Sequence, residues 1–181
     1  MTITNPFDLP PGTETIFVFP FMRPHDTMGR PTHFSATNLA GTKYFDAKIV
    51  VKGRKVERDG WDEIMDVEQS DLIRYKTGNG VMMRGYANDV RAEFRDWLDT
   101  FDGWRLWTDD AYAKGVMLWN MGMMGYNVRD LSTLAALVGV DWTEHWRDAL
   151  KYQKQRQNTL EPGHYAEVGR TAIKRLIKQW K

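Results

Sequence analysis

The spacing of apolar residues changes near residue 89, and this change limits the possible folds more than any other feature of the chain. Before it, residues 15–21 (TIFVFPF) are β-branched and aromatic, and residues 44–60 alternate around a turn at Gly53, so both segments predict strands. After it, apolar residues recur at intervals of three and four, which is typical of helices. With a further short strand predicted over 104–107, the order of elements indicates an α/β or α+β layered domain.

The second half of the chain predicts four helices. Asp89 is expected to cap the first, and the second is expected over 111–124, where Gly125 would end it. Asp130 is expected to cap the third, and the last is expected to begin near Glu167. The predicted inner face of the first helix consists of Val90, Phe94, Trp97, Leu98 and Phe101. A stripe on the second is expected to pack against the sheet: Met117, Met121 and Met124.

The glycine-rich segment 76–85 (KTGNGVMMRG) has a glycine spacing that suits a close approach to a phosphate. It lacks the second half of a P-loop, and no strand is predicted to lead into it. A flexible turn is therefore the expected structure of this segment.

The composition is that of one globular domain: 181 residues, 42% apolar and 27% charged, with a net charge of +1. Three early prolines predict an extended arm over 1–14, which leaves a single domain over 15–181. No apolar run reaches the roughly 18 residues of a membrane-spanning helix, and no secretory signal is visible, so we expect a cytoplasmic protein without a membrane partner. The absence of cysteine excludes a disulfide partner, a thiolate nucleophile and cysteine-ligated zinc.

Charge is distributed unevenly along the chain. Residues 57–110 carry a net charge of −7, whereas residues 151–181 carry +6. Basic residues at four-residue spacing are expected to line the outer face of the last helix: Arg170, Lys174, Lys178 and Lys181. Such a stripe provides salt-dependent affinity for phosphates or for an acidic partner, although a solvated helix face explains it equally well.

Two tryptophans, Trp142 and Trp146, lie one helical turn apart and close to the basic residues Arg147 and Lys151. This combination suits stacking on unpaired bases while the cations neutralise phosphates. It suits an anchor for another protein equally well. A third interpretation is that the rings are buried against the last helix.

Three segments of the second half follow one another in a recognisable order. They are RAEFRDWLDTFDGWRLWTDDAYAKGVML, VRDLSTLAALVG and GHYAEVGRTAIKRL. Over residues 90–180 they resemble the DEDD 3′-to-5′ exonuclease superfamily, a branch of the RNase H-like fold. In that family a helix ending in Trp-Leu precedes a strand and then a turn, which carries a catalytic Asp at the head of the next helix. The resemblance implies an RNase H-like α/β domain with a mixed sheet flanked by helices.

Catalysis in this superfamily requires four carboxylates, because they hold two divalent cations about 4 Å apart that polarise the phosphate and activate water. The resemblance places these carboxylates within residues 19–22, at Lys114 and at Gly169, and none of these residues is acidic. Only His164 matches its expected position, that of the general base. The resemblance therefore implies a catalytically degenerate, phage-type accessory protein without a cofactor, which binds nucleic acid or a protein of nucleic-acid metabolism.

Two alternatives remain open. An active Mg²⁺- or Mn²⁺-dependent 3′-to-5′ exonuclease would use Asp66 and Glu68 as metal ligands, with Asp109 or Asp110, Glu167 and His164 completing the catalytic site. The spacing disfavours it, because the DVE triplet precedes WTDD by only about 40 residues and follows no strand-like run. The other alternative is a protein-directed inhibitor of the phage type.

Overall fold

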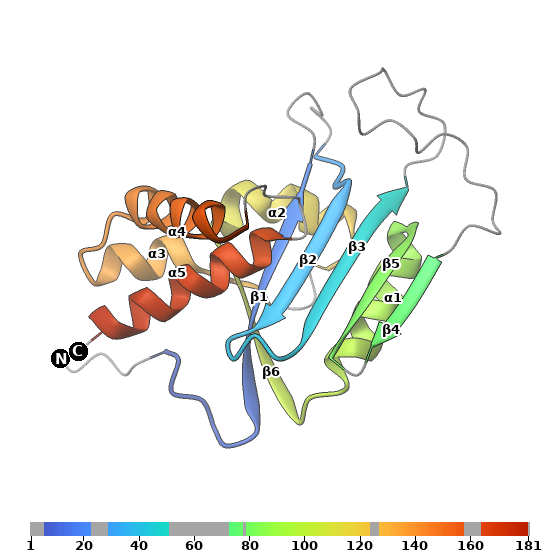
Figure 1. Ribbon diagram of the computed structural model, residues 1–181, viewed down its shortest axis with the longest axis horizontal. Coiled ribbons are helices and arrows are strands. Elements are labelled where there is room, and N and C mark those ends of the chain that lie inside the picture. Colours follow the sequence, from blue (N-terminus) through green and yellow to red (C-terminus); the bar gives the residue numbers. More distant parts are fainter. Residues whose placement is uncertain are drawn as a thin grey trace.

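The structure of the chain is a computed structural model that describes residues 6–22, 29–50, 73–77, 79–123, 127–157 and 164–180. Within these residues, seven strands form one mixed sheet, and helices pack on both of its faces (Figure 1). The prediction of an α/β domain is therefore confirmed. None of the described helices is long and apolar enough to cross a membrane.

The sheet has the strand order β4-β5-β3-β2-β1-β6-β7. The strands are β1 (Thr13–Phe21), β2 (His33–Asn38), β3 (Tyr44–Val50), β4 (Ile73–Thr77), β5 (Gly80–Tyr86), β6 (Gly103–Thr108) and β7 (Arg129–Asp130). Antiparallel pairing joins β1 to β2, β2 to β3 and β4 to β5. Parallel pairing joins β3 to β5, β1 to β6 and β6 to β7. The strand β1 therefore lies inside the sheet and has an antiparallel neighbour on one side and a parallel neighbour on the other.

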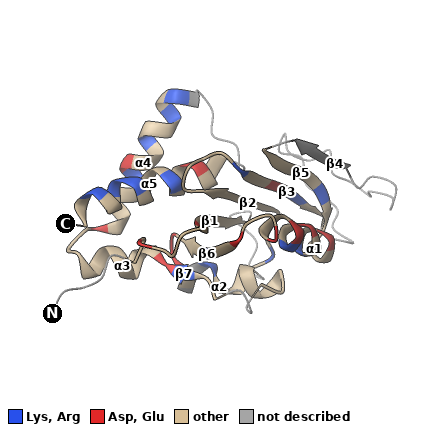
Figure 2. Ribbon diagram, turned by 90° about the horizontal axis from the view of Figure 1, so that it is seen from below, with Lys and Arg blue, Asp and Glu red and all other residues tan. Residues whose placement is uncertain are grey.

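Helices on the two faces of the sheet enclose separate cores. They are α1 (Ala87–Leu98), α2 (Ala111–Asn120), α3 (Leu131–Leu137), α4 (Trp142–Gln157) and α5 (Tyr165–Gln179). Figure 2 shows α1 and α2 on one side of the sheet and α4 and α5 on the other. Because side chains alternate along a strand, Ile16 and Val18 of β1 face the core under α1 and α2. Phe17 and Phe19 face the core under α3 and α5.

Several local predictions are confirmed. The strands predicted over 15–21 and 104–107 are present as β1 and β6. Four residues of the predicted helix face are buried in α1, whereas Phe101 lies beyond its end and is half-buried. Met117 and Met121 are buried, whereas Met124 lies outside the described residues. Phe7, expected in a loose arm, packs against Trp107 with 5.1 Å between ring centroids.

Two predictions about strands are wrong. The hairpin expected over 44–60 does not form around β3, because β3 pairs with β2 and β5, and the expected turn lies outside the described residues. The glycine-rich segment is a strand pair rather than a flexible turn, with β4 leading into β5. A Cβ at Gly80 would lie 2.5 Å from the carbonyl oxygen of Tyr44, so this glycine permits the close approach of β5 to β3.

Three predicted helix boundaries are also wrong. α1 begins at Ala87 and its N-cap residue is Tyr86, so Asp89 lies in the first turn, where its charge favours the helix dipole. α2 ends at Asn120 because Gly122, with φ of +69°, turns the chain before Gly125. α5 begins at Tyr165, two residues before the predicted start.

Candidate functional site

The first turn of α2 and the start of α5 both contact the end of β1. The Nζ of Lys114 in α2 lies 4.1 Å from the centroid of the Phe19 ring in β1. The backbone of α5 at Gly169 lies against the ring of Phe17. The structure thus brings together the positions at which the resemblance expects metal-binding carboxylates, and here they carry aromatic rings, an ammonium group and a glycine.

Phe19 is the centre of a stack of rings. Its ring lies 5.7 Å from that of Trp146 at an interplanar angle of 6°, and 4.9 Å from that of Tyr165 at 15°. Phe21 extends the stack, with its ring centroid 5.7 Å from that of Tyr165. We call the set Phe17, Phe19, Phe21, Lys114, Trp146 and Tyr165 the aromatic–lysine cluster. The cluster surrounds the end of β1 with apolar side chains. Its single ammonium group, that of Lys114, is placed for a cation–π contact with the Phe19 ring.

Gly169 sets how closely α5 packs on the sheet. A Cβ at this position would lie 2.0–2.3 Å from three atoms of the Phe17 ring. No side chain fits there while Phe17 keeps its position, because real Cβ contacts of that length do not occur. The resemblance expects an aspartate here, and the packing excludes one.

The acidic residues near the aromatic–lysine cluster have other partners. Asp109 follows β6 and is half-buried; burial raises its pKa, against the opposing effects of the Lys114 charge and a hydrogen bond donated by Thr108 Oγ1 at 3.1 Å. Glu167 accepts a hydrogen bond from Arg170 Nε at 2.8 Å. Among the residues that the structure describes, no three His, Asp or Glu side chains are grouped so that they could hold a metal ion.

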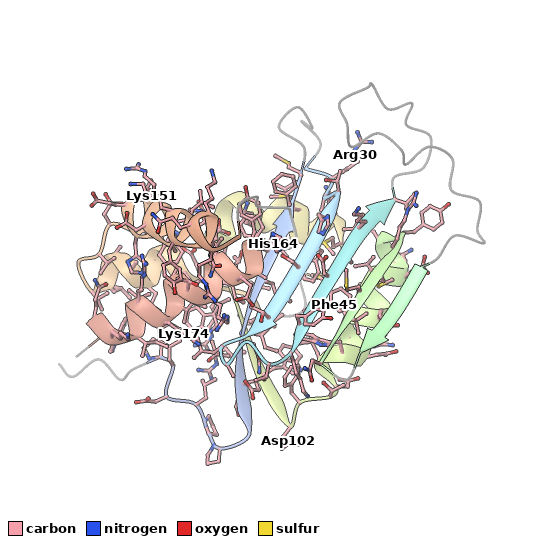
Figure 3. The ribbon with its side chains drawn as sticks, viewed as in Figure 1. Arg30, Phe45, Asp102, Lys151, His164 and Lys174 are labelled. Carbon is pink, nitrogen blue, oxygen red and sulfur yellow. The ribbon has the colours of Figure 1, made fainter. Side chains whose placement is uncertain are left out.

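The remaining candidates for an active site adjoin the aromatic–lysine cluster along the chain or lie outside the described residues. Asp66 and Glu68 lie outside them. Asp110 precedes α2, and its carbonyl oxygen accepts a hydrogen bond from the Lys114 N–H at 2.9 Å. His164 is the half-buried N-cap residue of α5 and precedes Tyr165 of the cluster (Figure 3).

Asp130 holds the neighbouring backbone together and is the cap that the sequence predicts. Its carboxylate accepts hydrogen bonds from the N–H groups of Ser132 and Thr133 at the start of α3. It also accepts one from the N–H of Ala111 at 3.1 Å, which ties α3 to α2. Burial acts to raise the pKa of Asp130, but these bonds and those from the Ser132 and Thr133 hydroxyls outweigh it, so its pKa is lowered.

The residues predicted to bind nucleic acid or a partner separate into two groups. Trp146 stacks on Phe19, and the ring centroid of Trp142 lies 5.9 Å from that of Trp146, so both half-buried rings pack partly against the protein. Arg170 is half-buried beside Glu167 and Gly41 rather than on an outer stripe. Lys174 and Lys178 are exposed on α5, whereas Lys181 lies outside the described residues.

Two exposed surfaces were not predicted. The Arg156 and Arg175 guanidinium groups lie 5.7 and 5.5 Å from the centroid of one ring, that of Tyr152. On α2, the side chains of Trp119 and Val116 are 66% and 58% exposed. The four-residue spacing of Tyr152 and Arg156 is visible in the sequence, but their meeting with Arg175 depends on how α4 packs on α5.

The raised pKa of Asp109 predicts how stability depends on pH. A carboxyl group whose pKa is raised by folding holds its proton more tightly in the folded state, so stability falls as pH rises from its unfolded value through its folded value. An amide in place of this carboxyl group would keep an oxygen to accept the Thr108 hydrogen bond without the buried charge. We therefore expect Asp109→Asn to raise the urea midpoint at pH 7 relative to wild type, and to do so less at pH 3. An equal change at both pH values would contradict this prediction.

Comparisons of the chain with protein-family models, with curated proteins and with solved structures give no significant match. The function of the chain is therefore inferred from the geometry of its own residues.

Proposed function

We propose that this chain is an RNase H-like domain related to the DEDD exonucleases that has lost its metal centre and acts by binding nucleic acid. The order of elements supports this relationship. α1 ends in Trp97-Leu98, β6 follows, and Asp109 and Asp110 form the turn at the head of α2. This is the order that the family resemblance implies for the second half of the chain.

The observation that carries the proposal is the position of Lys114. Its ammonium group lies over the ring of Phe19, where the family would place carboxylates around divalent cations. A fixed positive charge repels a divalent cation, and an aromatic ring offers it no oxygen ligand. Gly169 removes a further ligand, because its contact with Phe17 leaves no room for a side chain. The site is therefore suited to binding without metal-dependent hydrolysis.

A degradation and binding experiment tests the proposal. End-labelled single-stranded DNA and RNA are incubated with the protein in Mg²⁺ or Mn²⁺, with EDTA as the control. We expect the label to be retained at full length and bound in a complex that weakens steeply with added salt. Shortening that EDTA and Asp110→Asn both abolish would establish the active exonuclease instead. Absence of any complex with DNA or RNA would overturn the binding function.

A second candidate function, binding of a protein, is favoured by the exposed apolar side chains of α2. Trp119 and Val116 lie on this helix. Tryptophans frequently contribute a large part of the binding free energy at protein interfaces. The two candidates differ in their dependence on salt. Binding to phosphates weakens as counterions are added, whereas binding through Trp119 would change little.

A further inference from the structure

The helices α4 and α5 are fixed against each other by a buried polar and apolar interface. Gln153 of α4 is buried and donates a hydrogen bond from Nε2 to Thr171 Oγ1 at 2.7 Å. The ring of His145 lies with Nε2 2.9 Å from the carbonyl oxygen of Ala172. Ala149 and Ala172 are fully buried between the helices. Side chains on the outer surface of this pair therefore have defined relative positions.

Tyr152 lies on that outer surface and is 41% exposed. The Cζ of Arg156, one turn further along α4, lies 5.7 Å from its ring centroid, and the Cζ of Arg175 from α5 lies 5.5 Å from it. Both distances are in the range of a cation–π contact. We call the two arginines, together with the Tyr152 ring that both contact, the Tyr152 arginine pair. One ring thus holds two guanidinium groups from different helices.

The Tyr152 arginine pair has no neutralising partner in the part of the chain that the structure describes. No carboxylate there forms an ion pair with Arg156 or Arg175. Figure 2 shows further Lys and Arg residues on both helices. Two positive groups held near one ring repel each other, so an anion that contacts both relieves this repulsion. A planar guanidinium binds phosphate oxygens in a bidentate manner, and a stacked one loses less freedom on binding.

The surroundings favour a phosphate chain over a protein as the anion. The exposed side chains nearby on the two helices include Lys151, Lys154, Lys174 and Lys178. Lysine is depleted in the buried centres of protein interfaces, whereas rows of lysine and arginine are typical of surfaces that follow a phosphate backbone.

We propose that the Tyr152 arginine pair is a binding site for the phosphodiester backbone of single-stranded nucleic acid, an inference that rests on the proposed function. It is distinct from the aromatic–lysine cluster. Arg175 follows Tyr165 by ten residues of α5, which places them about 15 Å apart along the helix axis. The strand is therefore held on the outside of α4 and α5 rather than at the position of the lost metal centre.

The test is the salt dependence of binding to a fluorescein-labelled oligothymidylate, measured by anisotropy. We expect Arg156→Gln/Arg175→Gln to lower the affinity about tenfold, and to reduce the slope of log affinity against log salt by about 1.4, the value for two lost contacts to a single strand. The matched control is Arg91→Gln/Arg95→Gln, which removes two exposed charges from α1 on the other face of the sheet. It should leave the slope unchanged.

A further variant distinguishes the contribution of the Tyr152 ring to binding from that of the two arginine charges. Tyr152→Leu retains both arginines but removes the surface that orders them, so we expect weaker binding with the wild-type slope. If wild type binds but the two double variants lose affinity equally, the inference is wrong and the binding function stands. If wild type binds poly-glutamate as tightly as the oligonucleotide, the surface recognises an acidic protein instead. If wild type binds neither DNA nor RNA, both proposals fail.

Discussion

An alanine at position 169 is expected to lower the free energy of unfolding by about 3 kcal/mol, the upper part of the usual range for overpacking a core. Its Cβ would lie 2.0–2.3 Å from atoms of the Phe17 ring, and both residues are buried between α5 and β1. Alanine favours a helix over glycine by about 1 kcal/mol, so the steric effect exceeds the gain in propensity. The measurement is urea unfolding monitored by tryptophan fluorescence.

Gly115 provides the matched control for this substitution. It lies inside α2, and a Cβ there would meet nothing within 4 Å. Gly115→Ala should therefore raise stability by up to about 1 kcal/mol. In a Phe17→Leu background, which lacks the clashing ring, the loss caused by Gly169→Ala should shrink. A Gly169→Ala protein as stable as wild type would show that α5 does not pack against Phe17 as described.

This packing also implies that a single aspartate substitution would not create a metal centre here. An aspartate at position 169 needs the space that the Phe17 ring occupies. An aspartate in place of Phe19 would remove the ring on which Lys114, Trp146 and Tyr165 converge. Either substitution would therefore disrupt the packing around β1.

Local sequence signals predicted the elements whose pattern is contained within them. β1 is a run of β-branched and aromatic residues, and the buried face of α1 follows the spacing of Val90, Phe94 and Trp97. Asp130 caps α3 because its side chain reaches N–H groups only two and three residues away. In each case the interactions that decide the structure lie within a few residues of the signal.

Features that depend on distant residues were not predictable in this way. The parallel pairing of β3 with β5 joins segments about 36 residues apart, and nothing within either segment specifies it. Arg170 has helical spacing with Lys174, but its guanidinium group is held inward by Glu167 and packs over Gly41. The Tyr152 arginine pair likewise depends on the packing of α4 against α5.

The contents of the candidate site were not predictable from the sequence. The family resemblance assigned Lys114, Gly169 and residues 19–22 to one place; in the structure Lys114 contacts Phe19, and Gly169 lies against Phe17. The stacking of Trp146 and Tyr165 on Phe19 was not predictable, because it requires three elements to meet at defined angles. For the same reason, Trp146 resembled an exposed stacking platform in the sequence and is a packing residue in the structure.

Phe19→Ala is expected to lower the free energy of unfolding by about 4 kcal/mol, as for other large-to-small substitutions of buried phenylalanine. The ring is only 5% exposed, and its loss leaves a cavity between Trp146 and Tyr165 and removes the surface under the Lys114 ammonium group. Urea unfolding provides the measurement. Trp119→Ala is the control, because that ring is 66% exposed and its removal should change stability by less than about 0.5 kcal/mol.

The same variant separates a packing role of the aromatic–lysine cluster from a binding role. If the cluster only holds α2, α4 and α5 on the sheet, Phe19→Ala should keep wild-type affinity for the oligothymidylate under conditions in which it stays folded. Loss of affinity while the variant stays folded would mean that the bound strand contacts Phe19 itself. In that case nucleic acid would bind at the aromatic–lysine cluster, and the arginines at Tyr152 would at most extend that site.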